Sequence, residues 1–487
     1  MRRSKGEEVD ALLRELKQTM HKSLDKGNYE KAMASISTGC QILYEYNQYY
    51  VDNDFENGVV SVANEMKKSY CDDLKEYRRN ENTILFYDGF GLDTRGVAKM
   101  YLNALKKNGY HIVYITGKNA MGHIPETESI LLNADSSIYY IDFKTDYFNW
   151  AKELIHVFIQ TSPKAMFFYT TPYDASGAVA FAVMEGLTER FLIDLTDHAF
   201  WLGVKSNDYF CGSRAMSASN QIYERGIEKN RLIKLGVNLI IEEGLTDHSG
   251  LPFDVKKERY VFSGGALYKT LGDPDNYFYR IVSHILKKHK DVYFLYAGDG
   301  DRTEMDKILA EYPERAFIIS ERKDFYYLIQ NCTLYLNTYP MFGGMMMKYS
   351  ANAGKLPITL KHDKDSDGLL LDQESRKIEY ETYEDLVSDV DRLLDDKEYL
   401  SEREALLEGS VISEDRFVKN LKSTIEDHCT DYEHGQEQID TSKFKQEFYE
   451  RFDINRVKEK TSRIVNKSLF VSYPWMVKNI IRKKLKL

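Results

Sequence analysis

Apolar residues recur every three or four positions through the first part of the chain. Leu12, Leu16 and Met20 follow this spacing, and it returns within residues 29–50. Because this period matches one face of an α-helix, we predict a helical N-terminal segment over residues 1–80.

Two arrangements of this segment stay open. Residues 26–48 resemble a helical hairpin of the tetratricopeptide type, a unit that needs neighbouring repeats to bury its apolar faces. The alternative is a helical cap that packs on the domain that follows.

Beyond residue 82 the pattern changes to short apolar runs, rich in β-branched and aromatic residues, that alternate with helical stretches. Near-continuous apolar strands between helices are typical of a parallel sheet with both faces covered. The predicted strands of this series are 83–88, 111–116, 137–142, 164–170, 190–195, 208–213 and 231–236.

A second series of the same kind follows residues 251–260, which we interpret as a linker. Its predicted strands are 260–265, 291–298, 316–320, 333–340 and 355–360. Two such series favour an α/β protein with two doubly wound, Rossmann-like domains. The predicted domains are a helical extension at 1–80, a first Rossmann-like domain at 81–250, a second at 258–410, and C-terminal helices with a basic amphipathic tail at 411–487.

Composition narrows the class of protein. Hydrophobic residues make up 43% of the chain, with 36 Tyr and 24 Phe, which excludes a disordered chain. The five cysteines are widely spread and form no C-x-x-C pair, so we expect neither a disulfide framework nor a structural zinc site. The N-terminus lacks the apolar core of a signal peptide, and no run approaches the roughly 20 apolar residues of a spanning helix. We therefore expect a cytoplasmic protein.

Charge is distributed unevenly over the chain. The net charge is −10, yet residues 456–487 hold ten Lys or Arg against one acid, Glu459. In a helix after Pro474, the apolar residues Met476, Val477, Ile480, Ile481 and Leu485 fall on one side. This tail predicts peripheral attachment to the anionic inner face of the cell membrane, and nothing indicates a nucleic-acid partner. The alternative is an amphipathic helix that packs back on the first domain.

The loop after the strand at 190–195 contains Asp197, His198 and Trp201. Parallel sheets present ligands at the carboxyl ends of their strands, and a histidine beside a carboxylate suits general base catalysis. We predict that His198 or Asp197 acts in a site, with Trp201 in the same cleft. The alternative is a histidine and an indole that only pack beneath the interdomain linker.

Glycines follow the first predicted strand of each series. Gly89, Gly91 and Arg95 precede a helix, where they suit either an anionic ligand in the cleft or a tight structural turn. In the second series, Gly264 and Gly265 lead to Lys269, a combination that suits a diphosphate.

A later stretch also predicts ligand contacts. In residues 337–349 a strand ends, Gly343 and Gly344 interrupt the chain, and a helix begins with free N–H groups. No carboxylates have the context of a metal-held donor, so we predict no metal site. Asp363, Asp365 and Asp367 alternate, but they suit a solvated loop better than a cation site.

The order of these motifs over residues 258–362 resembles the donor domain of GT-B glycosyltransferases. The motifs are F-x-x-x-x-L-Y-K, D-x-x-F-L-Y-A-G and L-N-T-Y-P-x-x-G-G, the last leading into A-G-K-L-P. The O-GlcNAc transferase and adhesin-glycosylating family is the most similar. The resemblance implies that Lys269 contacts the donor diphosphate and that residues 316–322 hold the uracil ring. The donor-binding residues that we predict are Gly264, Gly265, Ser320, Arg322, Tyr339, Gly343, Gly344, Met345 and Tyr349.

The chain also departs from that family. Met345 and Met346 stand where the family has hydroxyl residues on the phosphates, and Tyr349 stands where it has a ribose-binding acid. Two glutamates of many retaining enzymes are replaced by Met341 and Tyr349. These departures favour an inverting reaction over a retaining one, and the resemblance implies a metal-independent site with backbone amides on the phosphates.

The predicted function is transfer of a hexosyl or N-acetylhexosaminyl group from a nucleotide sugar to a cell-surface glycan or lipid-linked acceptor, as in polysaccharide biosynthesis. A UDP-sugar is the expected donor, and no other cofactor is expected. One alternative is transfer to adhesin-type protein side chains. Another is a non-catalytic GT-B-like partner of a second transferase, since the hydroxyl residues and the ribose acid are missing.

Overall fold

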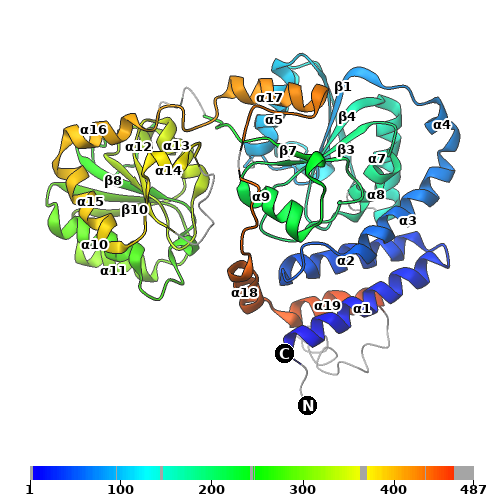
Figure 1. The fold of residues 1–487 in the computed structure, drawn as a ribbon, viewed down its shortest axis with the longest axis horizontal. Coiled ribbons are helices and arrows are strands. Elements are labelled where there is room, and N and C mark those ends of the chain that lie inside the picture. The colour runs from blue at the N-terminus through cyan, green and yellow to red at the C-terminus, as the bar shows by residue number, and fades with distance from the viewer. Residues whose placement is uncertain are drawn as a thin grey trace. The chain divides into compact units, whose positions relative to one another are not determined.

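The computed structural model describes residues 4–94, 96–142, 146–241, 245, 247–361, 370–433 and 435–465. These residues form two compact units (Figure 1). The first unit holds the described residues of Met1–Gly236 and Val418–Leu487, and the second holds those of Val237–Phe417. Each unit is built on one parallel sheet, as predicted.

The sheet of the first unit has seven parallel strands in the order β3-β2-β1-β4-β5-β6-β7. The order reverses between β1 and β4, which pair along their length. The strands are β1 (Asn80–Asp88), β2 (His111–Gly117), β3 (Ser136–Ile141), β4 (Pro163–Tyr169), β5 (Glu189–Ile193), β6 (Tyr209–Gly212) and β7 (Leu232–Lys234).

Helices join these strands, because a parallel pair needs a crossover connection. Residue Asp174 begins α8 by accepting a hydrogen bond from the N–H of Gly177 at 2.8 Å. The connecting helices are α5 (Gly96–Lys107), α6 (Pro125–Leu132), α7 (Tyr147–Thr161), α8 (Ala175–Val183) and α9 (Ala215–Ser219), with short helical turns η1 (Lys118–Ala120), η2 (Asn220–Glu224) and η3 (Lys229–Arg231).

The predicted helical N-terminal extension is confirmed. It consists of α1 (Lys5–Leu24), α2 (Tyr29–Tyr46), α3 (Asn53–Ser69) and α4 (Cys71–Glu76). Ser4 and Glu7 form a capping box at the start of α1. Leu16, Ile36 and Phe55 belong to the same apolar core as residues of the sheet, and α2 and α3 pack on α7 and α8. The extension is therefore part of the first unit.

The C-terminal helices return to the first unit. They are α17 (Glu414–Asp427), whose residues from Val418 onward belong to it, α18 (Ser442–Arg451) and α19 (Ile454–Val465). Figure 1 shows α19 beside α1, where Lys458 pairs with Glu8 at 2.5 Å and Val457 is buried. Residues 466–487, which include the predicted membrane-binding tail, lie outside the described residues.

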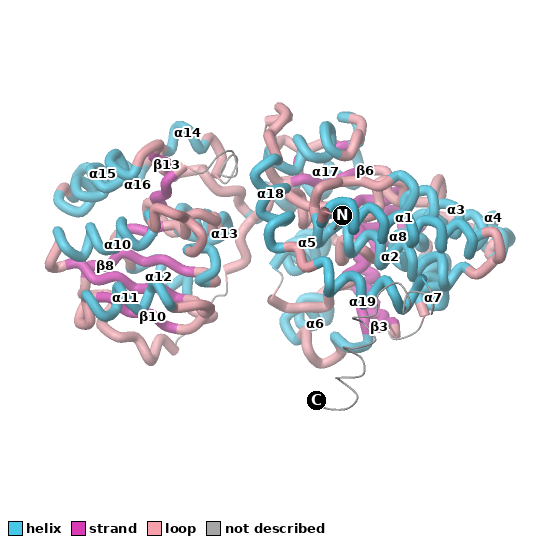
Figure 2. The backbone as a smooth tube through the Cα atoms, turned by 90° about the horizontal axis from the view of Figure 1, so that it is seen from below, coloured by secondary structure: helices cyan, strands magenta, loops and turns pink. Residues whose placement is uncertain are grey.

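The sheet of the second unit has six parallel strands in the order β10-β9-β8-β11-β12-β13. Figure 2 shows its strands among helices. The strands are β8 (Arg259–Gly264), β9 (Val292–Ala297), β10 (Ala316–Ile319), β11 (Leu334–Leu336), β12 (Pro357–Leu360) and β13 (Glu379–Tyr380). The helices are η4 (Leu267–Thr270), α10 (Tyr277–Lys288), α11 (Thr303–Glu311), α12 (Phe325–Asn331), α13 (Gly344–Asn352), α14 (Gln373–Arg376), α15 (Tyr383–Asp395) and α16 (Lys397–Ala405).

Both sheets have the strand order of doubly wound folds, in which the third, second, first, fourth and fifth strands lie side by side. This order confirms the predicted fold class. No helix among the described residues is both long enough and apolar enough to cross a membrane.

Candidate functional site

The reversal of strand order locates candidate ligand sites. In doubly wound sheets, ligands bind beyond the carboxyl ends of the strands where the order reverses. In the second unit this point lies between β8 and β11, which pair through Val261 and Leu334. The loops that follow these two strands hold the predicted donor-binding residues around Lys269 and Gly343.

Lys269 lies in η4, directly beyond β8, and is half-buried. Burial lowers the pKa of its ammonium, and no described carboxylate pairs with it. The N–H of Gly265 donates to the carbonyl of Ala297 at 2.9 Å, which fixes the turn before η4. The turn thus holds an uncompensated cation at the switch point of the sheet.

The loop after β11 is joined to this turn. The N–H of Met341 donates to the carbonyl oxygen of Lys269 at 3.1 Å. Within the loop, Thr338 donates to the carbonyl of Met341 at 2.7 Å, and the Asn337 side chain accepts from the N–H of Gly343 at 3.1 Å. The structure therefore brings Lys269 together with the segment that leads into α13.

The start of α13 offers backbone donors near Lys269. Gly343 is the N-cap, and no side chain among the described residues caps the helix. Met345, in the first turn, is 45% exposed, and Met346 lies beside Gly264. Such a helix start favours an anion, because its first N–H groups have no partner within the helix.

Two further residues at the carboxyl ends of β8 and β11 were not predicted as site residues. The Nδ2 of Asn337 and the Oγ of Ser263 are buried and have no hydrogen-bond partner among the described residues. Each residue lies at the carboxyl end of its strand. The polar residue Asn337 in the second half of the predicted strand 333–340 was a usable signal, whereas Ser263 follows directly on an apolar run.

The other residues predicted to bind the donor sugar nucleotide have side chains that lie elsewhere in the second unit. Arg322 makes a bidentate pair with Asp324, at 2.6 and 2.8 Å, and donates to the carbonyl of Ser249. The Tyr349 hydroxyl donates to the carbonyl of Ile240 at 2.8 Å. Ser320 is exposed after β10, and Tyr339 packs against the ring of Tyr277.

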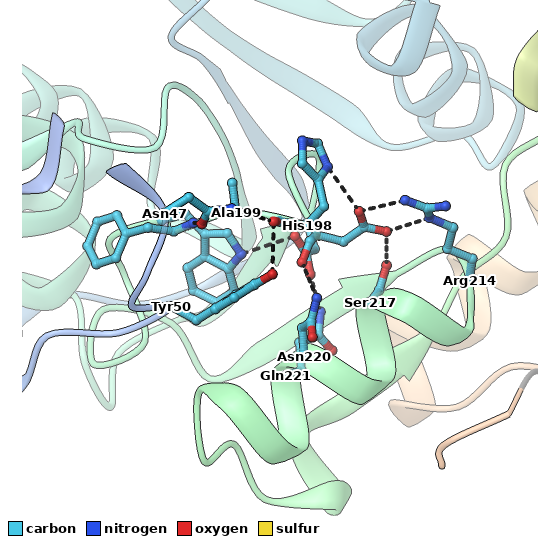
Figure 3. Close-up of polar contacts among 12 residues, drawn as sticks. Asn47, Tyr50, His198, Ala199, Arg214, Ser217, Asn220 and Gln221 are labelled. Atoms are coloured by element: carbon cyan, nitrogen blue, oxygen red, sulfur yellow. Dashed lines mark hydrogen bonds and ion pairs between the residues drawn. The ribbon is translucent and has the colours of Figure 1, made fainter. Parts of the chain in front are cut away.

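In the first unit, Asp197 and His198 lie together in the loop after β5, and Figure 3 shows His198 beside Arg214 and Ser217. The Asp197 side chain is 8% exposed, and its carboxylate accepts from Arg214 at 2.7 and 2.9 Å and from Ser217 at 3.0 Å. Burial alone would raise the pKa of Asp197, but the charge of Arg214 and the bonds from His198 and Arg214 lower it well below its ordinary value. Asp197 is thus a fixed anion, poorly suited to accept a proton.

The His198 imidazole is the accessible member of this pair. Its side chain is 35% exposed, with Nδ1 at 3.4 Å from Asp197 Oδ1. The ring lies about equally far from Phe444 and Phe448 of α18, at 6.1 Å from each centroid. A carboxylate beside Nδ1 favours the tautomer with a proton there, which leaves the Nε2 lone pair to accept one.

Trp201 is buried, and its indole N–H donates to Asp194 at 3.1 Å. Gln221 donates to the same carboxylate at 2.8 Å, and burial raises the pKa of Asp194 to about 6. One part of Trp201 also lines a small depression at the ends of β4 and β5, together with Thr170, Pro172, Ile193, Thr196 and Leu202.

The turn after β1 is closed by its own hydrogen bonds. The Asp88 carboxylate accepts from the N–H groups of Phe90 and Gly91, at 2.9 and 3.0 Å, and from the hydroxyl of Tyr114 at 2.8 Å. Gly91 has φ of +58°, and a Cβ on Gly89 would lie 1.9 Å from Oγ1 of Thr170. The structure of the turn therefore explains both glycines: Gly91 by its positive φ, and Gly89 by its close approach to Thr170. Arg95 lies outside the described residues.

Metal-binding side chains do not gather in the part of the chain that the structure describes, where no group of three His, Cys, Asp or Glu could hold an ion. Asp363, Asp365 and Asp367 are outside that part.

Comparisons with known proteins find similarity in structure alone. No protein-family model matches the sequence, and no curated protein matches it. The solved structure of a glycosyltransferase from Rickettsia africae matches with a TM-score of 0.53 and 12% identity, over 72% of this chain and 99% of that one. A protein from Listeria monocytogenes described as a UDP-N-acetylglucosamine 2-epimerase matches with a TM-score of 0.52 and 11% identity, over 72% and 97%. The likeness confirms the predicted resemblance to GT-B proteins at the level of the fold.

Proposed function

We propose that this protein is a glycosyltransferase that moves a sugar from a nucleotide-sugar donor to a hydroxyl group of a cell-surface glycan or lipid-linked acceptor. The observation that carries the proposal is Lys269, a half-buried cation with no described carboxylate partner, bonded through its backbone to the loop that opens α13. A diphosphate supplies the negative charge that this arrangement lacks. The name of the compared epimerase supports UDP as the nucleotide.

The proposed reaction is a single displacement with inversion. The acceptor oxygen bonds to the anomeric carbon while the bond from that carbon to the diphosphate oxygen breaks. His198 takes the proton of the acceptor hydroxyl, and Asp197 orients and stabilises the resulting imidazolium. Lys269 and the first N–H groups of α13 stabilise the departing diphosphate, in place of a divalent metal.

Gly264, Gly265, Tyr339, Gly343, Gly344 and Met345 belong to the proposed donor site, because they lie in the two loops that the Lys269 carbonyl joins. Ser320, Arg322 and Tyr349 are proposed to border the nucleoside. The turn at Gly89 and Gly91 and the loop at Trp201 are proposed to face the acceptor. We also propose that the tail after residue 465 holds the protein on the inner face of the cell membrane, through its basic residues.

The proposal is tested by incubating the protein with UDP-N-acetylglucosamine and following the sugar by proton NMR. A glycosyltransferase releases UDP, slowly with water and faster when a glycan or lipid-linked acceptor is added. Conversion at the second carbon with UDP still attached would instead indicate an epimerase. An unchanged donor in the presence of all acceptors, including an adhesin-type protein, would favour a non-catalytic partner.

A further inference from the structure

The loop after β5 is held by side chains of the N-terminal helices. Asn47, which ends α2 with φ of +47°, is fully buried. Its Nδ2 donates to the carbonyl of His198 at 3.0 Å, and its Oδ1 accepts from the N–H of Phe200 at 3.1 Å. The hydroxyl of Tyr50 donates to the same His198 carbonyl at 3.0 Å (Figure 3). Two donors from one segment therefore fix a single peptide group.

The next part of the loop is bound in the same way. The Glu56 carboxylate, in α3, accepts from the N–H groups of Gly203, Val204 and Lys205 at 2.8, 3.0 and 3.0 Å. Burial raises the pKa of Glu56, although these three bonds act in the opposite direction. The N-terminal segment thus binds the loop at residues 198–205 through three side chains.

Tyr50 is itself held in place by a buried arginine. The guanidinium of Arg225 is 5.0 Å from the ring centre of Tyr50 and 4.4 Å from the ring of Trp201. It also donates to the carbonyl of Ala199 at 2.5 Å. Removal of the Tyr50 hydroxyl leaves these ring contacts available, so Tyr50→Phe changes only the polar contacts of the hydroxyl, which are with the His198 carbonyl and with Thr441.

We infer that Asn47 and Tyr50 are positioning residues for His198. A carbonyl needs one donor to be satisfied, and the second donor restricts its direction. The orientation of this peptide group sets where the imidazole leaves the backbone, and Asp197 then holds the ring at 3.4 Å. The inference rests on the proposed function, in which His198 accepts the proton of the acceptor.

The test compares Tyr50→Phe with Tyr77→Phe. Tyr77 is also a buried tyrosine of the N-terminal part of the chain, and its hydroxyl donates to the carbonyl of Pro163 at 2.9 Å. Both variants lose the same type of bond, but the control bond is made to the first residue of β4 and not to the loop that holds His198. Tyr50→Phe is expected to lower kcat for UDP release from UDP-N-acetylglucosamine about fivefold with KM for the donor unchanged, whereas Tyr77→Phe leaves kcat unchanged.

A double variant separates positioning from general stability. If Tyr50 acts through His198, Tyr50→Phe lowers kcat no further once His198→Ala is present. Asn47→Gly, which keeps the positive φ accessible, is expected to lower kcat more than Tyr50→Phe and to show the same lack of additivity. Equal kcat in Tyr50→Phe, Tyr77→Phe and the unaltered protein, or full additivity with His198→Ala, would overturn the inference alone. Full activity of His198→Ala, or no UDP release by the unaltered protein, would overturn the proposed function and the inference with it.

Discussion

The backbone N–H of Met341 donates a hydrogen bond of 3.1 Å to the carbonyl oxygen of Lys269. This bond joins two loops that are 72 positions apart in the sequence and that leave neighbouring strands of one sheet. The ammonium of Lys269 therefore belongs to the same local structure as the start of α13. We therefore expect one bound anion to contact both the Lys269 ammonium and the first N–H groups of α13.

Replacement of His198 tests the proposed base. His198→Ala is expected to lower kcat by roughly 10²–10⁴, the usual contribution of a general base. The melting temperature should change little, because the imidazole is 35% exposed and the structural bonds of this residue come from its backbone carbonyl. Steady-state kinetics and thermal unfolding of the same sample check both points. A large loss of stability with full activity per folded molecule would support a packing role.

Asp197→Asn tests what the negative charge of Asp197, beside His198, contributes to stability and turnover. The folded state lowers the pKa of Asp197, so its charge contributes stability that is present above the ordinary pKa of aspartate, about 4, and is lost as the pH falls through the folded value. At pH 7 the variant removes the negative charge that pairs with Arg214 and is expected to lose about 3 kcal/mol of unfolding free energy. The difference from the unaltered protein should shrink as the pH falls below about 4.

Urea unfolding at several pH values measures this difference. Asp208→Asn is the control, because Asp208 also makes a bidentate pair with an arginine, but with Arg190 of β5, whereas Asp197 pairs with Arg214 and His198. Both variants should lose stability, and only Asp197→Asn should also lose turnover. Equal turnover in the two variants would argue against a role for Asp197 beside the base.

Chelation tests the proposed neutralisation of the diphosphate by Lys269 and backbone amides. Turnover of UDP-N-acetylglucosamine in EDTA is expected to stay within about twofold of the untreated protein, since the stabilising charge is a fixed side chain. UDP release measured before and after dialysis against EDTA decides the point. Loss of activity that magnesium or manganese restores would contradict it.

Deletion of residues 468–487 tests the proposed membrane attachment. Each basic residue near an anionic surface contributes about 1 kcal/mol, so the truncated protein is expected to lose most of its co-sedimentation with phosphatidylserine vesicles. A variant with Arg482→Gln, Lys483→Gln, Lys484→Gln and Lys486→Gln removes charge without shortening the chain and should have a similar, smaller effect. Unchanged vesicle binding, or a truncated protein that no longer folds, would favour a helix packed on the first unit.

The sheets were predictable from local pattern. The buried middle parts of β1 (residues 84–87) and β8 (residues 260–262) are continuous apolar runs, and polar or glycine residues follow each of them. The short strand β13 (Glu379–Tyr380) was missed, because two residues are too few to show a period and form a strand only by pairing with β12.

The surroundings of the candidate residues were less predictable. The pairing of Asp197 with His198 follows from their adjacency, but Asn47 and Tyr50 reach His198 across 151 and 148 positions, which no local pattern indicates. The engagement of Arg322 with Asp324 is a contact between residues two positions apart, and that spacing was visible in the sequence. Contacts between distant segments depend on how helices pack on the sheet.

The most direct measurement is the thermal stability of the full chain with UDP, GDP, CDP and TDP, for the unaltered protein and for Lys269→Ala. Lys307→Ala is the control, because Lys307 lies on α11 in the same unit and pairs with Glu304. One nucleotide, expected to be UDP, should stabilise the unaltered protein and Lys307→Ala by about 2.7 kcal/mol at a hundredfold excess over Kd, and should stabilise Lys269→Ala far less. Because burial lowers the pKa of Lys269, its charge costs stability at neutral pH, and Lys269→Ala alone should melt no lower than the unaltered protein. No stabilisation by any of the four nucleotides, or equal stabilisation of Lys269→Ala, would contradict the account.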